Sequence, residues 1–175
     1  MDEITVDHLL EPYRDLLGPD WRGYRNHCRR VEAFCLAQSP EPPSREDAQR
    51  LSIAVAFHDL GIWTADSMDF LPPSVGLAQR YLDQIGKPDW ADHIAAMIAQ
   101  HHKLSPYPND PWVERVRRAD AIDLSLGLLA FGLPRPRLQE IRRQFPQAGF
   151  LIGMLCRLGL YALKHPWRPL PMMRL

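Results

Sequence analysis

The stretch LSIAVAFHDLGIW, residues 51–63, decides how this sequence is interpreted. Ten of its thirteen residues are apolar or glycine, which predicts a segment buried in the protein core. His58 and Asp59 nevertheless lie side by side in its middle. A carboxylate buried without a partner is strongly destabilised by the loss of its hydration, so Asp59 requires a compensating group. The nature of that group is the question that the sequence raises.

The length and the charge of the chain limit the classes of protein to consider. A chain of 175 residues predicts one domain, over 1–175, with room for a proper core. Lys and Arg together number 21, as do Asp and Glu, so the formal net charge is zero and provides no general attraction to DNA or to a membrane. No basic stripe interleaved with aromatic residues is present either. We therefore expect neither a nucleic acid nor a membrane as partner.

The cysteines and the apolar runs indicate a reduced, cytoplasmic protein. Cys28 and Cys35 are seven residues apart, which places them two helical turns from each other, too far for a disulfide, and Cys156 has no paired spacing. The acidic N-terminal residues lack the features of a secretion signal. The longest apolar run, 149–165, is interrupted by Arg157 and is short for a membrane-spanning helix.

Proline and glycine divide the chain into periodic segments that predict an all-α fold. Apolar residues recur with helical spacing in each segment, and no convincing strand or hairpin signal is present. Gly61 is expected to end the helix that contains the HD pair. The predicted architecture is a single-domain bundle of about seven or eight helices. The expected helices cover about residues 4–17, 21–38, 44–60, 74–85, 89–103, 110–130, 135–144 and 148–164.

Several polar side chains are embedded in apolar helix faces. They are His27, His58, Asp59, His93, His101, His102, Asp120 and Asp123. A mixed set of imidazoles and carboxylates favours Mn, Fe, Co, Ni or Zn over Ca. The C-terminal end of a helix is negative, and the HD pair is expected near such an end. A cation is therefore suited to this place. Each residue taken singly has another interpretation: His27 could be a core histidine, and Asp120 could pair with Arg117 or Arg118. The ordered combination favours a metal ion as the partner of Asp59.

Three pieces of the sequence resemble the HD-domain superfamily of metal-dependent phosphohydrolases. They are YRNHCRRV (24–31), AVAFHDLGIW (54–63) and RRADAIDLSLG (117–127), in the superfamily's order of His, His-Asp and a distant Asp. DFLPPSVGLAQRYL and MIAQHHK are similar to a subgroup of stand-alone bacterial HD-domain proteins. The resemblance implies a helical bundle with a central metal site, core motifs within 21–130 and a C-terminal helical extension over 131–175. The ligands that it implies are His27, His58, Asp59 and Asp120.

The sequence departs from the superfamily in ways that concern a second metal. Extra histidines could come only from His93, His101 and His102. His93 and His101 are eight residues apart and point roughly 80° away from each other on an ideal helix, so they are not expected to bind one ion equally well. The glycine-tyrosine-proline signature of cyclic-di-nucleotide phosphodiesterases is absent, and Ile62 replaces an acidic residue found in some nucleotidases. One divalent transition metal ion per chain is the favoured expectation.

The expected activity is hydrolysis of a small phosphate ester or nucleotide by metal-activated water. Asp59 would also contact the attacking water, and His101 or His102 would protonate the leaving group. Asp123 would either orient a ligand from behind, or form a salt bridge or lie as a carboxylate on the helix surface, and His93 would lie behind the site or at a second metal. The residues expected to bind the substrate phosphate are Lys103 and one of Arg29, Arg30 and Arg117.

Other functions stay open at this stage. The extra histidines would also suit a di-iron oxygenase, and some relatives in the superfamily hydrate small nitriles. A ligand sensor that retains a metal site without catalysis is a further alternative. Substrate specificity is expected from the loops 61–73 and 103–110, and the apolar face of the last helix could form a homodimer contact.

Overall fold

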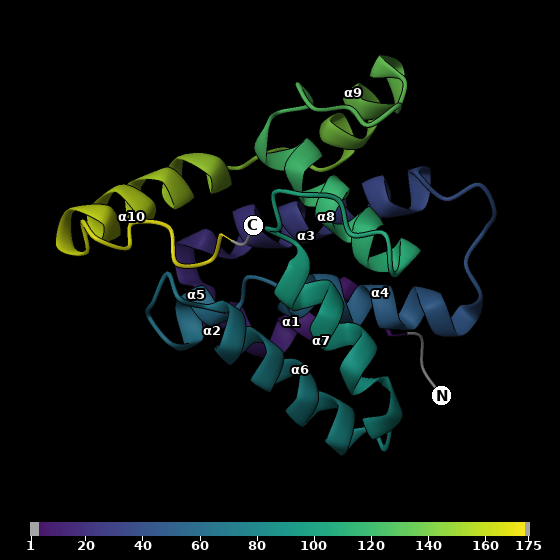
Figure 1. Ribbon diagram of the computed structural model, residues 1–175, viewed down its shortest axis with the longest axis horizontal. Coiled ribbons are helices and arrows are strands. Elements are labelled where there is room, and N and C mark those ends of the chain that lie inside the picture. The colour runs from purple at the N-terminus through teal and green to yellow at the C-terminus, as the bar shows by residue number, and fades with distance from the viewer. Residues whose placement is uncertain (1–3, 174–175) are drawn as a thin grey trace.

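The computed structural model describes residues 4–173, and the regular elements in that range are helices (Figure 1). Only the ends of the predicted domain range, residues 1–3 and 174–175, lie outside the described residues. The all-α prediction is confirmed, with seven helices of ten or more residues between residues 4 and 173. They are α3 (Trp21–Ala37), α4 (Arg45–Phe57), α6 (Leu71–Gln84), α7 (Ala91–Gln100), α8 (Pro111–Leu124), α9 (Arg135–Gln144) and α10 (Phe150–Lys164).

Shorter elements fill the gaps between these helices. The single helix predicted over 4–17 is wrong, because a 3-10 turn at Glu11–Tyr13 divides it, with Pro12 in the first turn where no N–H is required. The remaining short elements are α1 (Val6–Leu10), α2 (Arg14–Leu17), α5 (Gly61–Thr64) and the 3-10 turns Gly18–Asp20 and Pro88–Trp90.

The start of α6 and the end of α8 differ from the prediction for identifiable reasons. α6 begins at Leu71 and not near residue 74, because Pro72 and Pro73 occupy its first turn, where a missing N–H costs nothing. α8 ends at Leu124, six residues before the predicted 130. Leu126 and Gly127 adopt left-handed backbone angles of +57° and +84°, and the N–H of Gly127 donates to the carbonyl of Ile122, which closes the helix.

α4 is the central helix of the bundle. Every residue from Leu51 to Phe57 is buried, so the second half of the helix is surrounded by protein on all sides. α1, α3, α6 and α7 pack against α4, and α8 packs against both α3 and α7. The last residues of α4 therefore lead the chain directly into the interior of the molecule.

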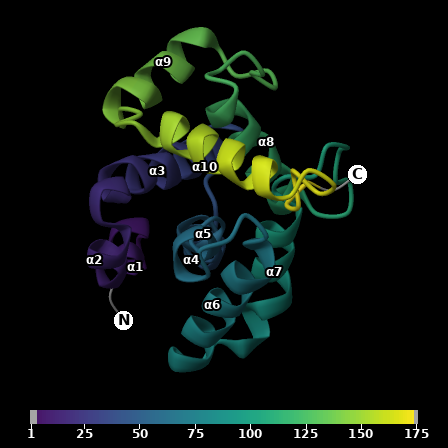
Figure 2. The ribbon, with the colours of Figure 1, turned by 90° about the vertical axis from the view of Figure 1, so that its left-hand side faces the viewer.

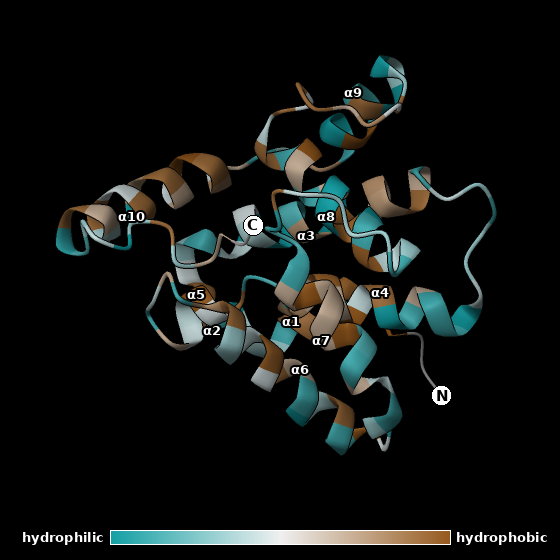
Figure 3. Cartoon of the chain, viewed as in Figure 1, coloured by the Kyte–Doolittle hydropathy of each residue, from teal (hydrophilic) through white to brown (hydrophobic). Residues whose placement is uncertain are grey.

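α9 and α10 lie on one side of this bundle, and α6 lies on the opposite side, in both views of the ribbon (Figures 1 and 2). The hydropathy colouring shows brown, apolar residues along much of α10 (Figure 3). Phe150 at its start packs against α3, where Gly23 lets the backbone approach: a Cβ there would lie 3.2 Å from the Ala148 carbonyl. Among the described residues, no helix is both long and apolar enough to cross a membrane.

Candidate metal centre

Six histidine and aspartate side chains converge in the centre of the bundle, from four places in the chain. α3 contributes one residue, the turn after α4 two, the end of α7 two and α8 one. They are His27, His58, Asp59, His101, His102 and Asp120. His102, whose side chain is 14% exposed, is the member that solvent reaches, and the side chains of the other five are at most 6% exposed.

The donor atoms are within a few ångströms of one another. The Nε2 atoms of His27 and His58 are 3.0 Å apart, and His58 Nε2 is 3.4 Å from Asp59 Oδ2. Asp120 Oδ1 is 3.5 Å from His27 Nε2. His101 Nε2 lies 3.3 Å from Asp59 Oδ1. The four ligands that the HD resemblance implies are therefore brought together, and His101 joins them.

Hydrogen bonds on the far side of three imidazoles fix their tautomers. His58 Nδ1 donates to the carbonyl of Val55 at 2.7 Å, and His101 Nδ1 donates to the carbonyl of Ile98 at 2.6 Å. His27 Nδ1 donates to Asp123 Oδ2 at 2.7 Å. A neutral imidazole has one N–H, so each Nε2 presents a lone pair to the centre. This is the arrangement in which histidines bind metal ions.

Both His58 and His101 reach this state through the same local device. Each is the C-cap residue of its helix, α4 or α7, and each bonds the carbonyl three residues before it. The last carbonyls of a helix have no intrahelical partner, so the imidazole satisfies one of them while its other nitrogen points away. The negative ends of two helices thereby face the same centre, which favours a cation there.

Several polar atoms of the cluster have no hydrogen-bond partner among the described residues. They are Asp59 Oδ1, Asp120 Oδ1 and His101 Nε2, all buried. Buried polar atoms are almost always satisfied, and lone pairs that face one another cannot satisfy each other. A bound cation would accept a lone pair from each of these three atoms. The donor set of imidazole nitrogens and carboxylate oxygens fits a transition metal ion.

Three overlapping groups of donors each have ligand atoms that lie within 4.8 Å of one another. The groups are His27, His58 and Asp120; His58, Asp59 and His101; and His101, His102 and Asp120. The number of donors exceeds the four ligands predicted for one ion. His101, which the sequence analysis considered as a proton donor, supplies a metal-facing lone pair in this geometry.

Burial and mutual charge shift the pKa values of these groups. Burial alone would lower the pKa of His27, but the carboxylates of Asp123 and Asp59 raise it to about 9. The pKa of His58 is lowered to about 3, by burial and by the neighbouring histidines. Burial, together with the charges of Asp59 and Asp123, raises the pKa of Asp120 to about 7. The imidazole of His58 is therefore neutral at any physiological pH.

Asp123 and Arg30 support the cluster from behind. The guanidinium of Arg30 donates from Nε and Nη2 to the two oxygens of Asp123, at 2.5 and 2.8 Å, and both side chains are completely buried. Burial would raise the pKa of Asp123, but the bonds from His27 and Arg30 lower it to about 2. The structure combines two of the roles considered for Asp123, because its carboxylate accepts from His27 Nδ1 and also forms a buried salt bridge with Arg30, and it does not lie on the helix surface. Arg30 was expected to contact substrate and is instead enclosed behind the ligands.

Arg117 and Lys103 lie together near the end of α7. Arg117 donates from Nε and Nη2 to Glu114 at 2.7 Å, and from Nη1 to the backbone carbonyl of Lys103 at 3.3 Å. Arg117 therefore anchors the loop that carries Lys103, which corrects its expected role in substrate binding. Lys103 directly follows His102, so its backbone lies beside the solvent-accessible member of the cluster.

His93 lies away from the centre and belongs to none of the three donor groups. Its Nε2 is 3.2 Å from Asp110 Oδ2, where Asp110 also caps the start of α8. The first turn of α7 carries His93, whereas His101 follows the last turn, so the length of the helix separates them. The structure therefore places His93 neither at a second metal nor behind the candidate ligands.

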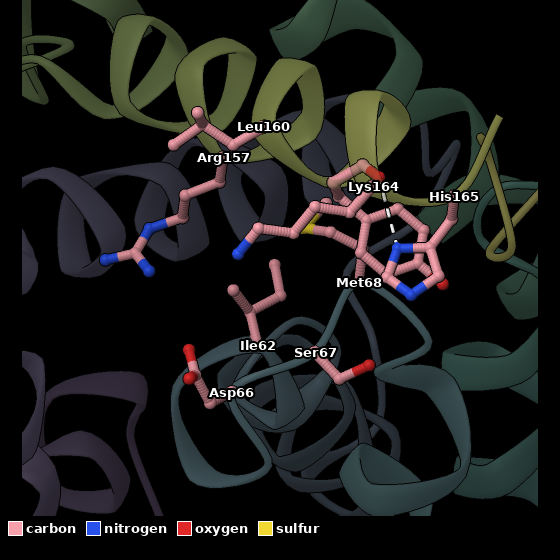
Figure 4. Close-up of a pocket in the computed structure, with 9 residues that line it drawn as sticks. Ile62, Asp66, Ser67, Met68, Arg157, Leu160, Lys164 and His165 are labelled. Carbon is pink, nitrogen blue, oxygen red and sulfur yellow. Dashed lines mark hydrogen bonds between the residues drawn. The ribbon is translucent and has the colours of Figure 1, made fainter.

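A surface pocket of about 470 Å³ lies between α10 and the loop after α5 (Figure 4). Its lining residues are Ile62, Asp66, Ser67, Met68, Arg157, Leu160, Tyr161, Lys164 and His165. Ile62 and Met68 also pack in a small apolar cluster with Phe70, whose ring centre is 5.9 Å from that of His102. Part of the loop 61–73, from which specificity was expected, therefore lines a pocket one layer of side chains from the donors.

Comparisons with known proteins find nothing similar to this chain: no family model, no curated protein and no solved structure matches it. The chemistry of the site therefore has to be argued from the donor cluster and from the motifs. The carbonyls of Val55 and Ile98, which accept from His58 and His101, were not expected from the sequence. A histidine directly after a predicted helix end is the signal that could have indicated them.

Proposed function

We propose that this chain is a metal-dependent hydrolase of the HD type that acts on a small phosphate ester, such as a nucleotide. The observation that carries the proposal is the convergence of three imidazole lone pairs and two carboxylates in a buried centre. The order of the motifs also supports the proposal. A histidine, the HD pair and a distant aspartate follow one another as in the phosphohydrolases that the sequence resembles.

The first ion would be held by His27, His58, Asp59 and Asp120, and His101 with His102 adds donors for a second ion beside it. A divalent transition metal in this place would lower the pKa of a bound water and polarise a phosphoryl oxygen. The five buried members of the cluster exclude bulk water from the donors, which strengthens electrostatic interactions with a charged substrate.

We assign proton transfer with substrate to His102 and not to His101. When only the first ion is bound, His102 is not one of its ligands; its side chain is reached by solvent, and its Nδ1 lies 3.4 Å from Asp120 Oδ2. His101 is buried, and its Nδ1 proton is engaged by the Ile98 carbonyl. Lys103, next in the chain, is the proposed contact for the substrate phosphate.

The pocket beside α10 is the proposed place for the rest of the substrate. Lys164 brings positive charge to it, Arg157 lines it while paired with Asp20, and Ile62, Met68 and Tyr161 bring apolar surface. The Lys164 side chain projects across the pocket towards Ile62 in the close-up (Figure 4). A substrate with an anionic group on a flat or apolar body fits these walls.

Metal content and turnover, measured on the same preparations, test the proposal. We expect one or two transition metal ions per chain in the wild type, and hydrolysis of at least one ester in a panel of nucleotides and small phosphate esters. His58→Ala should lose metal and turnover together, whereas the matched control His93→Ala, outside the cluster, should retain both. If Asp59→Ala retained metal and full turnover, the proposal would be wrong.

A second candidate is favoured by one observation, the presence of four imidazoles around two carboxylates. Such a set can hold two irons, and a di-iron centre would carry oxygen-dependent chemistry in place of hydrolysis. Two irons per chain, near-ultraviolet absorption that disappears on iron removal, and oxygen consumption with substrate would identify this alternative.

A further inference from the structure

α10 is apolar on two opposite sides. On the inner side, Phe150, Met154, Leu158 and Tyr161 pack against the two apolar clusters of the protein. On the outer side a row of residues faces water. The row consists of Ile152, Leu155, Cys156, Gly159, Leu160 and Leu163, and its four large members are 71%, 59%, 62% and 82% exposed. A helix that is apolar all round is normally buried on all sides, so the outer row lacks a cover.

The spacing of this outer row makes it complementary to itself. About a midpoint between residues 157 and 158, Ile152 mirrors Leu163, Leu155 mirrors Leu160, and Cys156 mirrors Gly159. Two antiparallel copies of α10 related by a two-fold axis would therefore place large residues together at the ends and small ones at the crossing point. An isologous contact of this kind uses the same patch on both subunits.

Gly159 near the centre of the row is required neither by close packing nor by its backbone angle within residues 4–173. A Cβ added at this position would meet no atom within 4 Å, and its backbone angle is not left-handed. Glycine inside a helix costs about 1 kcal/mol relative to alanine. A small residue at the crossing point allows two helices to approach closely, which gives Gly159 and its mirror residue Cys156 a role in a helix pair.

The charges of α10 favour a protein partner over a lipid surface. The outer row contains no charged residue, and helices that lie on membranes carry many basic residues on their polar face. Arg157 is turned inward, where it donates to Asp20 at 2.5 Å and lies over the ring of Trp63. Lys164 is the other basic residue of the helix, so α10 lacks a basic face.

We propose that two copies of this chain associate through the outer row of α10, with the two helices antiparallel. A fully exposed aliphatic side chain offers about 100 Å² of apolar surface. At their exposed fractions, the four large side chains of the row therefore supply roughly 300 Å² per copy. The contact is thus below the roughly 1,200 Å² total of standard interfaces, and the dimer dissociates on dilution. Trp167, 98% exposed, is within about 14 Å of Leu163 along the chain and extends the contact.

Sedimentation at increasing protein concentration tests the association. The wild type is expected to shift from monomer to dimer. Leu155→Glu should remain monomeric over the same range, with unchanged circular dichroism and metal content. The matched control is Leu128→Glu, which places the same charge at a leucine that is 90% exposed outside α10 and should still dimerise. A wild type that is monomeric throughout, or equal behaviour of the two variants, would overturn the proposal.

Cross-linking tests the antiparallel arrangement separately. In a Cys156→Ser background, a mixture of Ile152→Cys and Leu163→Cys chains should form disulfide-linked pairs, whereas Ile152→Cys alone should not. Efficient linkage of Ile152→Cys to itself would indicate parallel helices and contradict the model. Flotation of the wild type with anionic phospholipid vesicles, without self-association in solution, would assign the row to a membrane surface and also overturn the proposal.

Discussion

At the scale of single residues, the centre depends on which imidazole nitrogen carries the proton. His27, His58 and His101 each donate from Nδ1 to a fixed acceptor, a carboxylate or a helix-terminal carbonyl. In the neutral imidazoles the three Nε2 atoms therefore present lone pairs to the centre, and His27, whose pKa is about 9, has to lose a proton first. Preorganised donors of this kind lose little conformational freedom on binding, which favours tight metal binding.

The hydrogen bond from His27 to Asp123 can be tested by substituting Asp123. Asp123→Asn would weaken the acceptor of His27 Nδ1–H and leave the buried guanidinium of Arg30 without a counter-charge. We expect metal affinity to fall by about 10- to 100-fold, and the free energy of unfolding to fall by about 3–5 kcal/mol. Competition with a chromophoric chelator and urea unfolding measure the two effects.

Glu114→Gln is the matched control for Asp123→Asn. Glu114 is also a carboxylate of α8 paired with an arginine, Arg117, but it touches no donor of the cluster. This variant should lose stability while it keeps the metal affinity of the wild type. Equal metal affinity in Asp123→Asn and the wild type would show that Asp123 does not orient His27.

The pKa values predict how metal affinity depends on pH. Without metal, His27 with a pKa of about 9 is protonated at neutral pH, and Asp120 with a pKa of about 7 is partly protonated. A metal ion has to displace these protons, so affinity should rise by about tenfold per pH unit above neutrality and level off near pH 9, with a steeper rise below pH 7. Metal titrations in weak buffer should detect between one and two protons released at neutral pH, one from His27 and a fraction from Asp120. A pH-independent affinity would contradict this assignment.

The four residues that the HD resemblance implies as ligands each lie in a periodic apolar segment of the sequence, and the structure brings their side chains together. The contribution of His101 could not be identified in this way. The sequence analysis placed His93 and His101 on one continuous ideal helix over 89–103. α7 ends at Gln100, so His101 follows the local geometry of a helix end and turns inward, while His93 pairs with Asp110.

At the scale of elements, the turn between α4 and α5 determines where the HD pair lies. Gly61 was expected to end the helix, but α4 already ends at Phe57 and Gly61 begins α5. Its role is close approach: its N–H donates to Ser74 Oγ at 2.9 Å, and an added Cβ would lie only 2.4 Å from the Phe70 carbonyl. Glycine is required here by the backbone of a neighbouring segment.

Gly61→Ala therefore tests how the HD turn is held against α6. The added methyl group would push the start of α6 away, and we expect a loss of about 1–3 kcal/mol in stability together with weaker metal binding. The control is Gly76→Ala within α6, where the nearest atom to an added Cβ is the end of Arg80 at 3.6 Å. This change should be neutral or stabilise by up to about 1 kcal/mol. Similar thermal unfolding of the two variants would contradict the close-approach argument.

The order and approximate extent of the long helices followed from proline, glycine and apolar periodicity. The expected helices over 21–38 and 135–144 agree closely with α3 and α9. The predicted boundary was wrong where backbone geometry, and not composition, determines the helix end. The left-handed pair Leu126 and Gly127 ends α8 earlier than predicted. That pair lies in an apolar run, so periodicity alone continued the helix through it.

At the scale of the whole molecule, the donors connect elements that are distant in the chain. α3, the turn after α4, the end of α7 and α8 all contribute to one centre, and these are also the elements that enclose the core. The cluster places like-charged carboxylates and opposed lone pairs in the interior, which costs stability when no cation is present. Metal binding and folding should therefore be coupled.

This coupling leads to a prediction for the complete protein. A metal that binds only the folded state stabilises it by about 2.7 kcal/mol when its concentration is a hundred times the Kd. For a chain of this size, that shift corresponds to about 5–11 °C in Tm. Scanning calorimetry before and after chelation, and after metal is restored, should show a reversible change of this size. His93→Ala should show the same change and His58→Ala none, because only His58 is a donor. A Tm that is indifferent to metal in the wild type would show that the buried centre does not bind it.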